Sequence, residues 1–388
     1  MKIAISLIWI RHKVAGGVES FTRNLLDGFM NDSSDNTYIL LCSKDNIESF
    51  AHYTTDSRFS IIECPVVTAD LKQTLLYESF KLDKQVSKIG ADLCFVPSYR
   101  MPLLWKKNKY VVVIHDLISA NIPEMFKWYR RWWLNFATKR AWKSANTVVT
   151  ISNFVANDLS RRFGAINHNH TIYNPILPSK DAEEFENMAS KFGIEKGRYF
   201  YTVCSLARNK NLFTLLKMMK ALSLDNEFDK YKLIISGVGF SKLAKNRFDA
   251  EPFINYIEQN NLSERCIFTG FVSNEERNAL IINCKEFLFP SVFEGFGMPV
   301  IEAMELGANV ITTKCASIPE VSQRKAIYVT NPYDEMEWIN KIRENMNSGS
   351  KSIHFREYEL EFVLQRYLMV FDSTINTIEV NSLCQNLF

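Results

Sequence analysis

Long apolar runs and paired cysteines are both missing from this sequence of 388 residues. No uncharged apolar stretch approaches the roughly 18 residues of a membrane-spanning helix. The apolar start MKIAISLIWIRHK is too short for a signal peptide and lacks a small-residue cleavage site. The eight cysteines are scattered without a C-x-x-C pair, which favours a reduced protein over a disulfide scaffold. We therefore expect a cytoplasmic protein that does not cross the membrane.

A strong charge of one sign and a glycine- or proline-rich composition are also absent. The net charge of +3 at pH 7 is too small to predict a nucleic-acid partner, and 14 glycines with 11 prolines argue against a fibre or a disordered chain. The charge is uneven, because residues 1–175 hold 22 basic and 15 acidic side chains, while the rest of the chain holds 24 and 28. The basic first part predicts an anionic partner there.

Short apolar segments that alternate with helical stretches run through the sequence. Strands are expected at 2–10, 38–41, 59–62, 93–96, 110–114 and 147–151, and again at 199–204, 232–236, 267–271, 286–290 and 309–312. Such alternation predicts an α/β fold with parallel sheets covered by helices on both faces. The length of the chain favours two domains.

A polar stretch with two prolines separates the two runs of strands. We predict a first domain over 1–175, a linker over 176–195, a second domain over 196–365, and a C-terminal helix over 366–388 that crosses back to the first domain. Ligands of such sheets bind at the carboxyl ends of the strands, where loops lead into helices. Functional side chains are therefore expected in those loops.

The segment FLFPSVFEGFGMPVIEAMELGANVIT, residues 287–312, is the most informative one. A strand ends near Pro290, a loop with Gly295 and Gly297 follows, and Pro299 suits a first helical turn. Glycine lets the backbone approach a ligand closely, and a helix N-terminus presents N–H groups without intrahelical partners. The segment therefore predicts a site for a diphosphate or for sugar hydroxyls.

Two carboxylates flank this loop, Glu294 within it and Glu302 about one turn inside the helix. Helical side chains lean toward the helix N-terminus, so we expect both carboxylates to point into one cleft. One would serve the sugar and the other a ribose diol. The alternative is a plain strand–helix turn, in which Glu302 only benefits from the positive end of the helix dipole.

This E-x7-E segment resembles the signature of retaining glycosyltransferases of the GT-B fold, family 4 (group 1), which includes many polysaccharide and lipopolysaccharide assembly enzymes. The resemblance extends in order over GGVESFTRNLL, VVVIHDLISANIPEMF, TVVTISNF, TIYNPI, VCSLARNKNL, KLIISGVG and IFTGFVSNEE. It implies two Rossmann-like domains with parallel sheets that face an interdomain cleft. It also implies transfer of a sugar from a nucleotide diphosphate with retention of configuration, and no need for a metal.

The resemblance assigns cations and glycines to the donor phosphates. Lys210 matches the position of the family lysine, and Arg208 stands one residue away from the usual arginine, because relatives often read Arg-Lys-Asn where this chain reads ARNKN. Both residue types suit phosphate oxygens, although a solvated loop charge is an equal alternative for Arg208. Gly16 and Gly17 are expected to close over the phosphates and the reacting centre.

The remaining site residues also follow from the resemblance. His115 is expected to line the donor sugar, and Glu294 to bind the sugar hydroxyls; these two are the predicted catalytic residues. Glu302 would accept the ribose hydroxyls. The backbone N–H groups of Phe296, Gly297 and Met298 are expected to assist Glu294. The loop that holds Phe271 and Val272 is expected to read the base.

Residues 126–143, FKWYRRWWLNFATKRAWK, combine aromatic rings with cations. An anionic membrane surface attracts this combination. We therefore predict that the first domain lies on the inner face of the cell membrane and takes a lipid-diphosphate-linked saccharide as acceptor. The alternative is a helix whose rings pack in the core. The residues predicted to contact the membrane or the acceptor are Lys127, Trp128, Arg130, Arg131, Trp132 and Trp133.

Other functions of twin Rossmann folds fit less well. No G-x-G-x-x-G follows the first strand, which argues against a dinucleotide-dependent oxidoreductase. A nucleotide-sugar epimerase of the same fold and a catalytically silent assembly scaffold stay open. His168 and His170 have no nearby carboxylate or cysteine in the sequence, so no metal and no cofactor beyond the nucleotide sugar are expected. GDP-mannose is the favoured donor, with UDP- and dTDP-sugars open.

Overall fold

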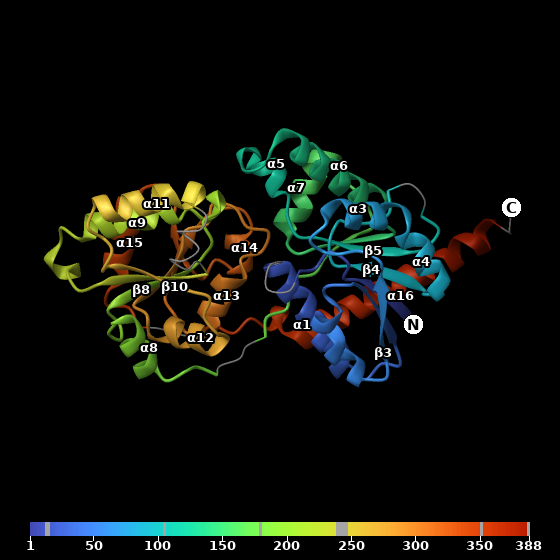
Figure 1. Cartoon of the computed structure of the whole chain (residues 1–388), viewed down its shortest axis with the longest axis horizontal. Coiled ribbons are helices and arrows are strands. Elements are labelled where there is room, and N and C mark those ends of the chain that lie inside the picture. Colours follow the sequence, from blue (N-terminus) through green and yellow to red (C-terminus); the bar gives the residue numbers. More distant parts are fainter. Residues whose placement is uncertain (12–15, 104–105, 178–180, 238–246, 350–351, 386–388) are drawn as a thin grey trace. The chain divides into compact units, whose positions relative to one another are not determined.

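The computed structural model divides into two compact units, Met1–Leu177 with Arg356–Phe388, and Pro178–Phe355 (Figure 1). The structure describes residues 1–11, 16–103, 106–177, 181–237, 247–349 and 352–385, with the backbone alone for 247–249 and 377–385. Within these ranges no helix is long and apolar enough to span a membrane.

The first unit is built on a parallel sheet of seven strands in the order β3-β2-β1-β4-β5-β6-β7. The strands are β1 (Lys2–Ser6), β2 (Thr37–Ser43), β3 (Phe59–Cys64), β4 (Leu93–Val96), β5 (Tyr110–Ile114), β6 (Thr147–Thr150) and β7 (Asn169–Thr171). Every residue of β4, β5 and β6 is buried, as expected for parallel strands covered on both faces. The strand order reverses between β1 and β4, and such a switch point is where open α/β sheets bind ligands.

Helices of the first unit include one from the far end of the chain. The main ones are α1 (Gly17–Asn31), α3 (Leu71–Phe80), α4 (Leu82–Ile89), α6 (Trp128–Ser144), α7 (Asn153–Phe163) and α16 (Leu360–Gln385). Helix α16 packs on α1 at Gly28, where an added Cβ would lie 3.1 Å from Leu360 Cδ1. The absence of a side chain at residue 28 therefore lets α16 lie close to α1.

The second unit holds a parallel sheet of six strands in the order β10-β9-β8-β11-β12-β13. The strands are β8 (Tyr199–Val203), β9 (Lys232–Ser236), β10 (Cys266–Gly270), β11 (Glu286–Phe289), β12 (Val310–Thr313) and β13 (Ile327–Val329). The helices are α8 (Phe185–Phe192), α9 (Leu212–Leu222), α11 (Arg247–Gln259), α12 (Asn274–Asn283), α13 (Met298–Glu305), α14 (Ile318–Val321) and α15 (Glu335–Asn345). Here the order reverses between β8 and β11.

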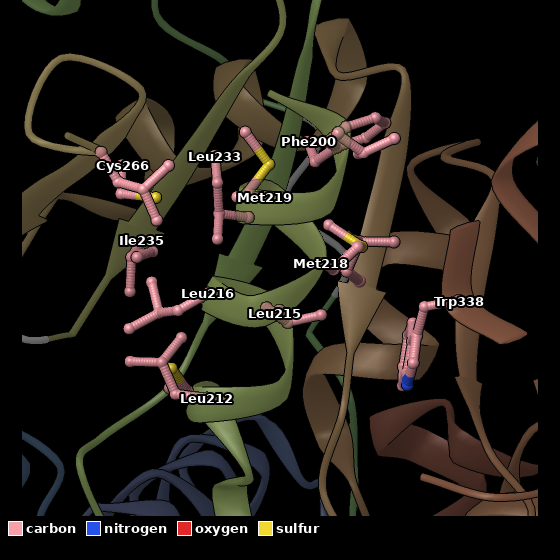
Figure 2. Close-up of a cluster of buried hydrophobic side chains, with 14 of the residues drawn as sticks. Phe200, Leu212, Leu215, Leu216, Met218, Met219, Leu233, Ile235, Cys266 and Trp338 are labelled. Atoms are coloured by element: carbon pink, nitrogen blue, oxygen red, sulfur yellow. The ribbon is translucent and has the colours of Figure 1, made fainter. Parts of the chain in front are cut away.

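Helix α9 is fixed to this sheet by a buried apolar cluster (Figure 2). Leu212, Leu215 and Met219 repeat at the helical spacing and are almost completely buried, and Trp338 of α15 completes the cluster. The 3₁₀ turn η3 (Arg208–Lys210) directly precedes α9. Core packing therefore holds the position of a turn that carries two predicted donor-binding residues.

The predicted α/β fold with two parallel sheets is confirmed. Several details differ from the sequence prediction. The first strand ends at Ser6, because residues 7–10 form a turn, and strands β7 and β13 were not predicted. The C-terminal helix, predicted over 366–388, begins at Leu360, and the second unit, predicted to reach residue 365, ends at Phe355. Residues 176–195, interpreted as a linker, contain helix α8. Helix α8 packs on α12 with Met188 buried, so this stretch is part of the second unit.

Glu286, the first residue of β11, gives a testable pH dependence. Its carboxylate is fully buried and accepts hydrogen bonds from Asn345 Nδ2 at 2.9 and 3.1 Å, and burial raises its pKa to about 8. The unfolded chain releases this proton near 4.5, so the folded state binds more protons between these values and loses stability as pH rises.

We predict that Glu286→Gln, which stays neutral, matches the parent near pH 5 and exceeds it at pH 9 by on the order of a few kcal/mol in free energy of unfolding. Thermal or denaturant unfolding across this range measures the difference. A difference between the two proteins that does not change with pH would contradict the assignment.

Candidate active site

The loop between β11 and α13 is held in a defined shape. Gly297 caps the N-terminus of α13 with φ of 95°, in the left-handed region that favours glycine, and Pro299 is the second residue of the helix. Ser317 Oγ donates to the backbone carbonyls of Glu294 and Phe296, at 2.9 and 3.1 Å. The bonds from Ser317 thus hold the loop in place, and the loop ends at the N–H groups of the first turn of α13.

Asn209, in the turn η3, connects this turn to the loop between β11 and α13. Its side chain is buried and donates to Phe293 O at 3.1 Å, and its own carbonyl accepts from Val292 N at 2.8 Å. Because η3 follows β8 and the loop follows β11, these bonds cross the switch point of the second sheet. Asn209 and Ser317 cannot be recognised as site residues from the sequence, because nothing in their spacing indicates these partners.

Lys210 and Glu294 meet at this switch point. Lys210 Nζ donates to Glu294 Oε1 at 2.5 Å, with 24% and 14% of the two side chains exposed, and the same Nζ lies 5.7 Å from the centre of the Phe289 ring. The sequence assigned the lysine to phosphates and the carboxylate to the sugar, and the structure brings the two side chains into one ion pair. Partial burial makes this attraction stronger than that of an exposed pair.

Arg208 differs from Lys210 in its surroundings. Successive residues of a 3₁₀ turn point about 120° apart. Lys210 therefore faces Glu294, whereas Arg208 is exposed and forms no ion pair within the described residues. Its role at the diphosphate stays a prediction.

Glu302 belongs to a second ion pair. Its Oε2 lies 3.4 Å from Nη1 of Arg277 on α12, and Arg277 Nε is buried without a hydrogen-bond partner in the part of the chain that the structure describes. The two carboxylates of the E-x7-E segment are therefore each held by a different cation. Arg277 was not predicted, because it lies 25 residues from Glu302 in the sequence.

The loop before α12 holds the residues predicted to read the base. Phe271 is 72% exposed and Val272 is half-buried. The loop begins at Gly270, which has φ of 80° and accepts a hydrogen bond from Gly237 N at 2.8 Å. The last two residues of the segment KLIISGVG lie outside the described residues.

The first unit carries the predicted histidine at the carboxyl end of β5. His115 Nε2 lies 3.0 Å from the carbonyl oxygen of Pro97, and the ring contacts Phe21 of α1 edge-on at 4.9 Å between centres. Burial lowers the pKa of His115 to about 4, so the imidazole is neutral at pH 7. A carbonyl can only accept, so Nε2 carries the proton and Nδ1 is left as an acceptor.

The predicted glycines lie where α1 begins. Gly16 is its N-cap, with φ of 58° and ψ of −134°, and Gly17 is the first helical residue; both are exposed. A side chain at Gly16 would meet no atom within 4 Å, so the requirement for glycine there is conformational. Through Phe21, this helix and His115 are in contact within one unit.

Helix α6 is exposed in its first half and packed in its second half. Trp128 is 80% exposed and Trp132 63%, whereas Trp142 is buried and donates from Nε1 to Gly164 O at 2.8 Å. The interpretation as a helix with rings packed in the core therefore holds for the second half alone, and membrane contact of the exposed first half stays a prediction. Of the residues predicted to contact membrane or acceptor, all are exposed except the half-buried Trp133: Lys127, Trp128, Arg130, Arg131 and Trp132.

In the described ranges, no group of three or more His, Cys, Asp and Glu side chains could hold a metal ion. His168 Nε2 lies 3.3 Å from the carbonyl of Trp142, and His170 lies on the edge strand β7.

Comparison with known families matches both units. Residues 184–361 match the family of glycosyl transferases group 1, and residues 15–180 match glycosyltransferase family 4. Among curated proteins, the chain is 24% identical to the O-antigen chain mannosyltransferase RfbU of Salmonella typhimurium over 78% of this chain and 80% of the relative. It is 23% identical to the O-antigen chain mannosyltransferase B of Escherichia coli, over 58% of each.

A third relative and two solved structures are also similar to this chain. A diphospho-undecaprenol N-acetylgalactosaminyltransferase of Campylobacter jejuni is 25% identical over 62% of each chain. The structure of Anabaena HepE in complex with UDP and glucose superposes with a TM-score of 0.66 at 15% identity, covering 99% of this chain and 100% of that one. The structure of WaaG, a glycosyltransferase involved in lipopolysaccharide biosynthesis, superposes with a TM-score of 0.65 at 14% identity, covering 97% and 99%. This chain belongs to the group 1 glycosyltransferases of the GT-B fold.

Proposed function

We propose that this glycosyltransferase moves a hexose from a nucleotide diphosphate sugar to a saccharide acceptor, with retention of configuration, in the synthesis of a surface polysaccharide. The Lys210–Glu294 pair beside the N-terminus of α13 is the observation that carries the proposal. A cation and a helix N-terminus attract a diphosphate, and a carboxylate accepts from sugar hydroxyls. The pair therefore matches both halves of a nucleotide sugar.

In the proposed reaction, Lys210 leaves its ion pair with Glu294 and binds the diphosphate of the donor. The cation and the N–H groups of α13 then stabilise the negative charge that grows on the leaving diphosphate, which is the main electrostatic demand of the step. Glu294, released from its partner, accepts from the sugar hydroxyls, and Arg277 holds Glu302 toward the ribose. His115 stays neutral and offers Nδ1 as an acceptor to the sugar. With these groups, no metal ion is required for the chemistry.

The donor and the acceptor are proposed from the relatives. Two of them are named as O-antigen mannosyltransferases, which supports GDP-mannose as the donor. HepE was solved with UDP and glucose, so UDP-sugars are the next candidates. The relative from Campylobacter jejuni is named for a diphospho-undecaprenol substrate, which supports a lipid-diphosphate-linked saccharide as the acceptor.

We predict that Glu294→Gln lowers release of nucleoside diphosphate from the preferred donor by about 10²-fold, because the amide neither pairs with Lys210 nor binds sugar hydroxyls as a charged acceptor. Release is measured over a panel of GDP-, UDP- and dTDP-sugars, with and without acceptor. Glu344→Gln is the control, since it breaks the Lys341–Glu344 pair of 2.7 Å on α15 of the same unit. Full activity of Glu294→Gln would refute the role of this carboxylate.

The first half of α6 supports membrane binding of the first unit. Exposed tryptophans next to Arg130 and Arg131 give apolar area and positive charge on one short segment. The neighbouring helix α3 exposes Leu76 and Phe80 at 59% and 56%. Apolar side chains exposed next to cations are a combination that suits a membrane surface. We propose that this surface lies on the inner face of the cell membrane.

We predict that the protein floats with phosphatidylglycerol vesicles in a sucrose gradient and much less with phosphatidylcholine vesicles. Replacing Trp128 and Trp132 together by Ala should weaken binding at least about tenfold, because each ring contributes roughly 1.5–3 kcal/mol when buried in lipid. Leu224→Ala is the control, because Leu224 is 79% exposed but lies in the other unit. Equal recovery with both kinds of vesicle, or none with either, would count against the proposal.

A further inference from the structure

Two hollows lie at the edge of the first sheet, beside β7 and α16. One has a volume of about 440 Å³ and is lined only by side chains that carry a polar group; we call it the edge pocket. The other, of about 270 Å³, is lined in part by the apolar side chains of Ile172, Met369 and Val370. His170 and Arg366 line both hollows. The residues of the edge pocket are Asn153, Asn169, His170, Thr171, Tyr173 and Arg366.

Arg366 of α16 is the cation of the edge pocket. Its Nη2 donates to the carbonyl oxygen of Thr171 at 2.7 Å, and within the described residues it forms no ion pair. A guanidinium has five N–H donors, and this bond uses one of them. No Asp or Glu side chain lines either hollow. A half-buried cation with donors left over and no carboxylate on the walls around it attracts an anion.

Other groups of the edge pocket also favour an anion. Helix α7 begins at Asn153 on the pocket wall, with Ser152 as its N-cap, so the positive end of the helix dipole lies at the pocket. His170 is exposed, and burial of its ring together with the nearby charge of Arg366 lowers its pKa. The ring is therefore neutral at pH 7 and has one N–H to donate. The walls combine a cation, a helix N-terminus and neutral donors.

We propose that the edge pocket binds the phosphoryl group of a small ligand, with Arg366 and the N-terminus of α7 as its main contacts. The guanidinium fork matches phosphate oxygens, and a helix N-terminus is a common phosphate site. A phosphoryl dianion also gains more from these positive groups than a carboxylate with one charge. The pocket belongs to the first unit and the proposed donor site to the second, so the proposal goes beyond the proposed function and does not depend on it.

The phosphoryl group has two sources with this chemistry. One is a soluble phosphorylated metabolite, which would use the edge pocket alone. The other is a membrane lipid with a phosphate in its headgroup. Its acyl chain would lie in the neighbouring hollow against Ile172, Met369 and Val370, because that hollow shares Arg366 with the edge pocket.

NMR of the full chain, labelled with ¹³C in its histidines and methionines, tests the proposal with inorganic phosphate as the probe. His170 reports on the edge pocket that it lines, and Met298 reports on the donor site, because it is the first residue of α13. At constant pH and ionic strength, we expect phosphate to move the His170 signals and to saturate them at no more than about 10 mM. His170 signals that do not move in this range would overturn the proposal.

Two variants assign the binding to the edge pocket. Arg366→Gln should weaken phosphate binding at His170 about tenfold or more, because it removes a charged donor. Asn153→Asp should weaken it similarly at an unchanged melting temperature, since it places a negative charge on the wall but suits the first turn of a helix. Arg161→Gln is the matched control, because it removes an exposed cation from the last turn of the same helix. Parental affinity in both pocket variants, or equal loss in Arg161→Gln, would contradict the proposal.

A pair of probes separates the two sources. Glycerol 3-phosphate and dihexanoyl phosphatidic acid carry the same phosphomonoester on glycerol, and only the second has acyl chains. A lipid source predicts tenfold or more tighter binding of the phosphatidic acid, with the gain lost in Met369→Gln. A soluble source predicts equal affinities. Both results support a phosphoryl site, whereas failure of both probes to displace inorganic phosphate from His170 would count against it.

The proposed function fails by a different signal. Met298 belongs to the donor site, so it should respond to GDP or UDP and should still do so in Arg366→Gln. If Met298 responds to neither nucleotide while His170 responds to phosphate, the proposed donor site is wrong and the edge pocket stands. A response of Met298 to a nucleotide with no response of His170 to phosphate contradicts the edge pocket alone.

Discussion

The ion pair between Lys210 and Glu294 is the interaction on which the proposed donor site depends. It joins the turn after β8 to the loop after β11, the two strands between which the second sheet reverses its order. Asn209 and Ser317 hold the backbone on either side, so the pair forms on a rigid frame. In the proposed exchange Lys210 pairs with the diphosphate, and hydrogen bonds from the sugar hydroxyls replace the cation at Glu294.

Both units use the same topological feature with different chemistry. In each sheet, side chains from the ends of the two strands at the switch point meet, as Lys210 with Glu294 in one and Arg100 with Trp9 in the other. The second unit places its pair beside a helix N-terminus, which suits an anion. The first unit buries its arginine against Glu78 and beside the Trp9 ring, so this cation is already neutralised by a carboxylate.

The sequence predicted what depends on local pattern. Alternating apolar segments indicated the sheets, and the glycine loop before Pro299 indicated the start of a helix. It could not predict contacts between distant residues, such as Lys210 with Glu294 across 84 positions or Arg277 with Glu302 from a neighbouring helix. The shift of Arg208 by one residue was visible in the sequence. The exposure of its side chain was not, because that exposure depends on the 3₁₀ turn that carries Arg208. In α6, the mixture of rings and cations suited both a membrane surface and a core, and only packing shows that the second half is buried and the first half exposed.

A crystal structure of the full chain with GDP, or with UDP, would show where the diphosphate binds. We expect a phosphate oxygen at about 3 Å from Lys210 Nζ, a typical hydrogen-bond distance, further phosphate contacts to the first turn of α13, and Glu294 separated from the lysine. A diphosphate bound elsewhere, with the Lys210–Glu294 pair unchanged, would contradict it.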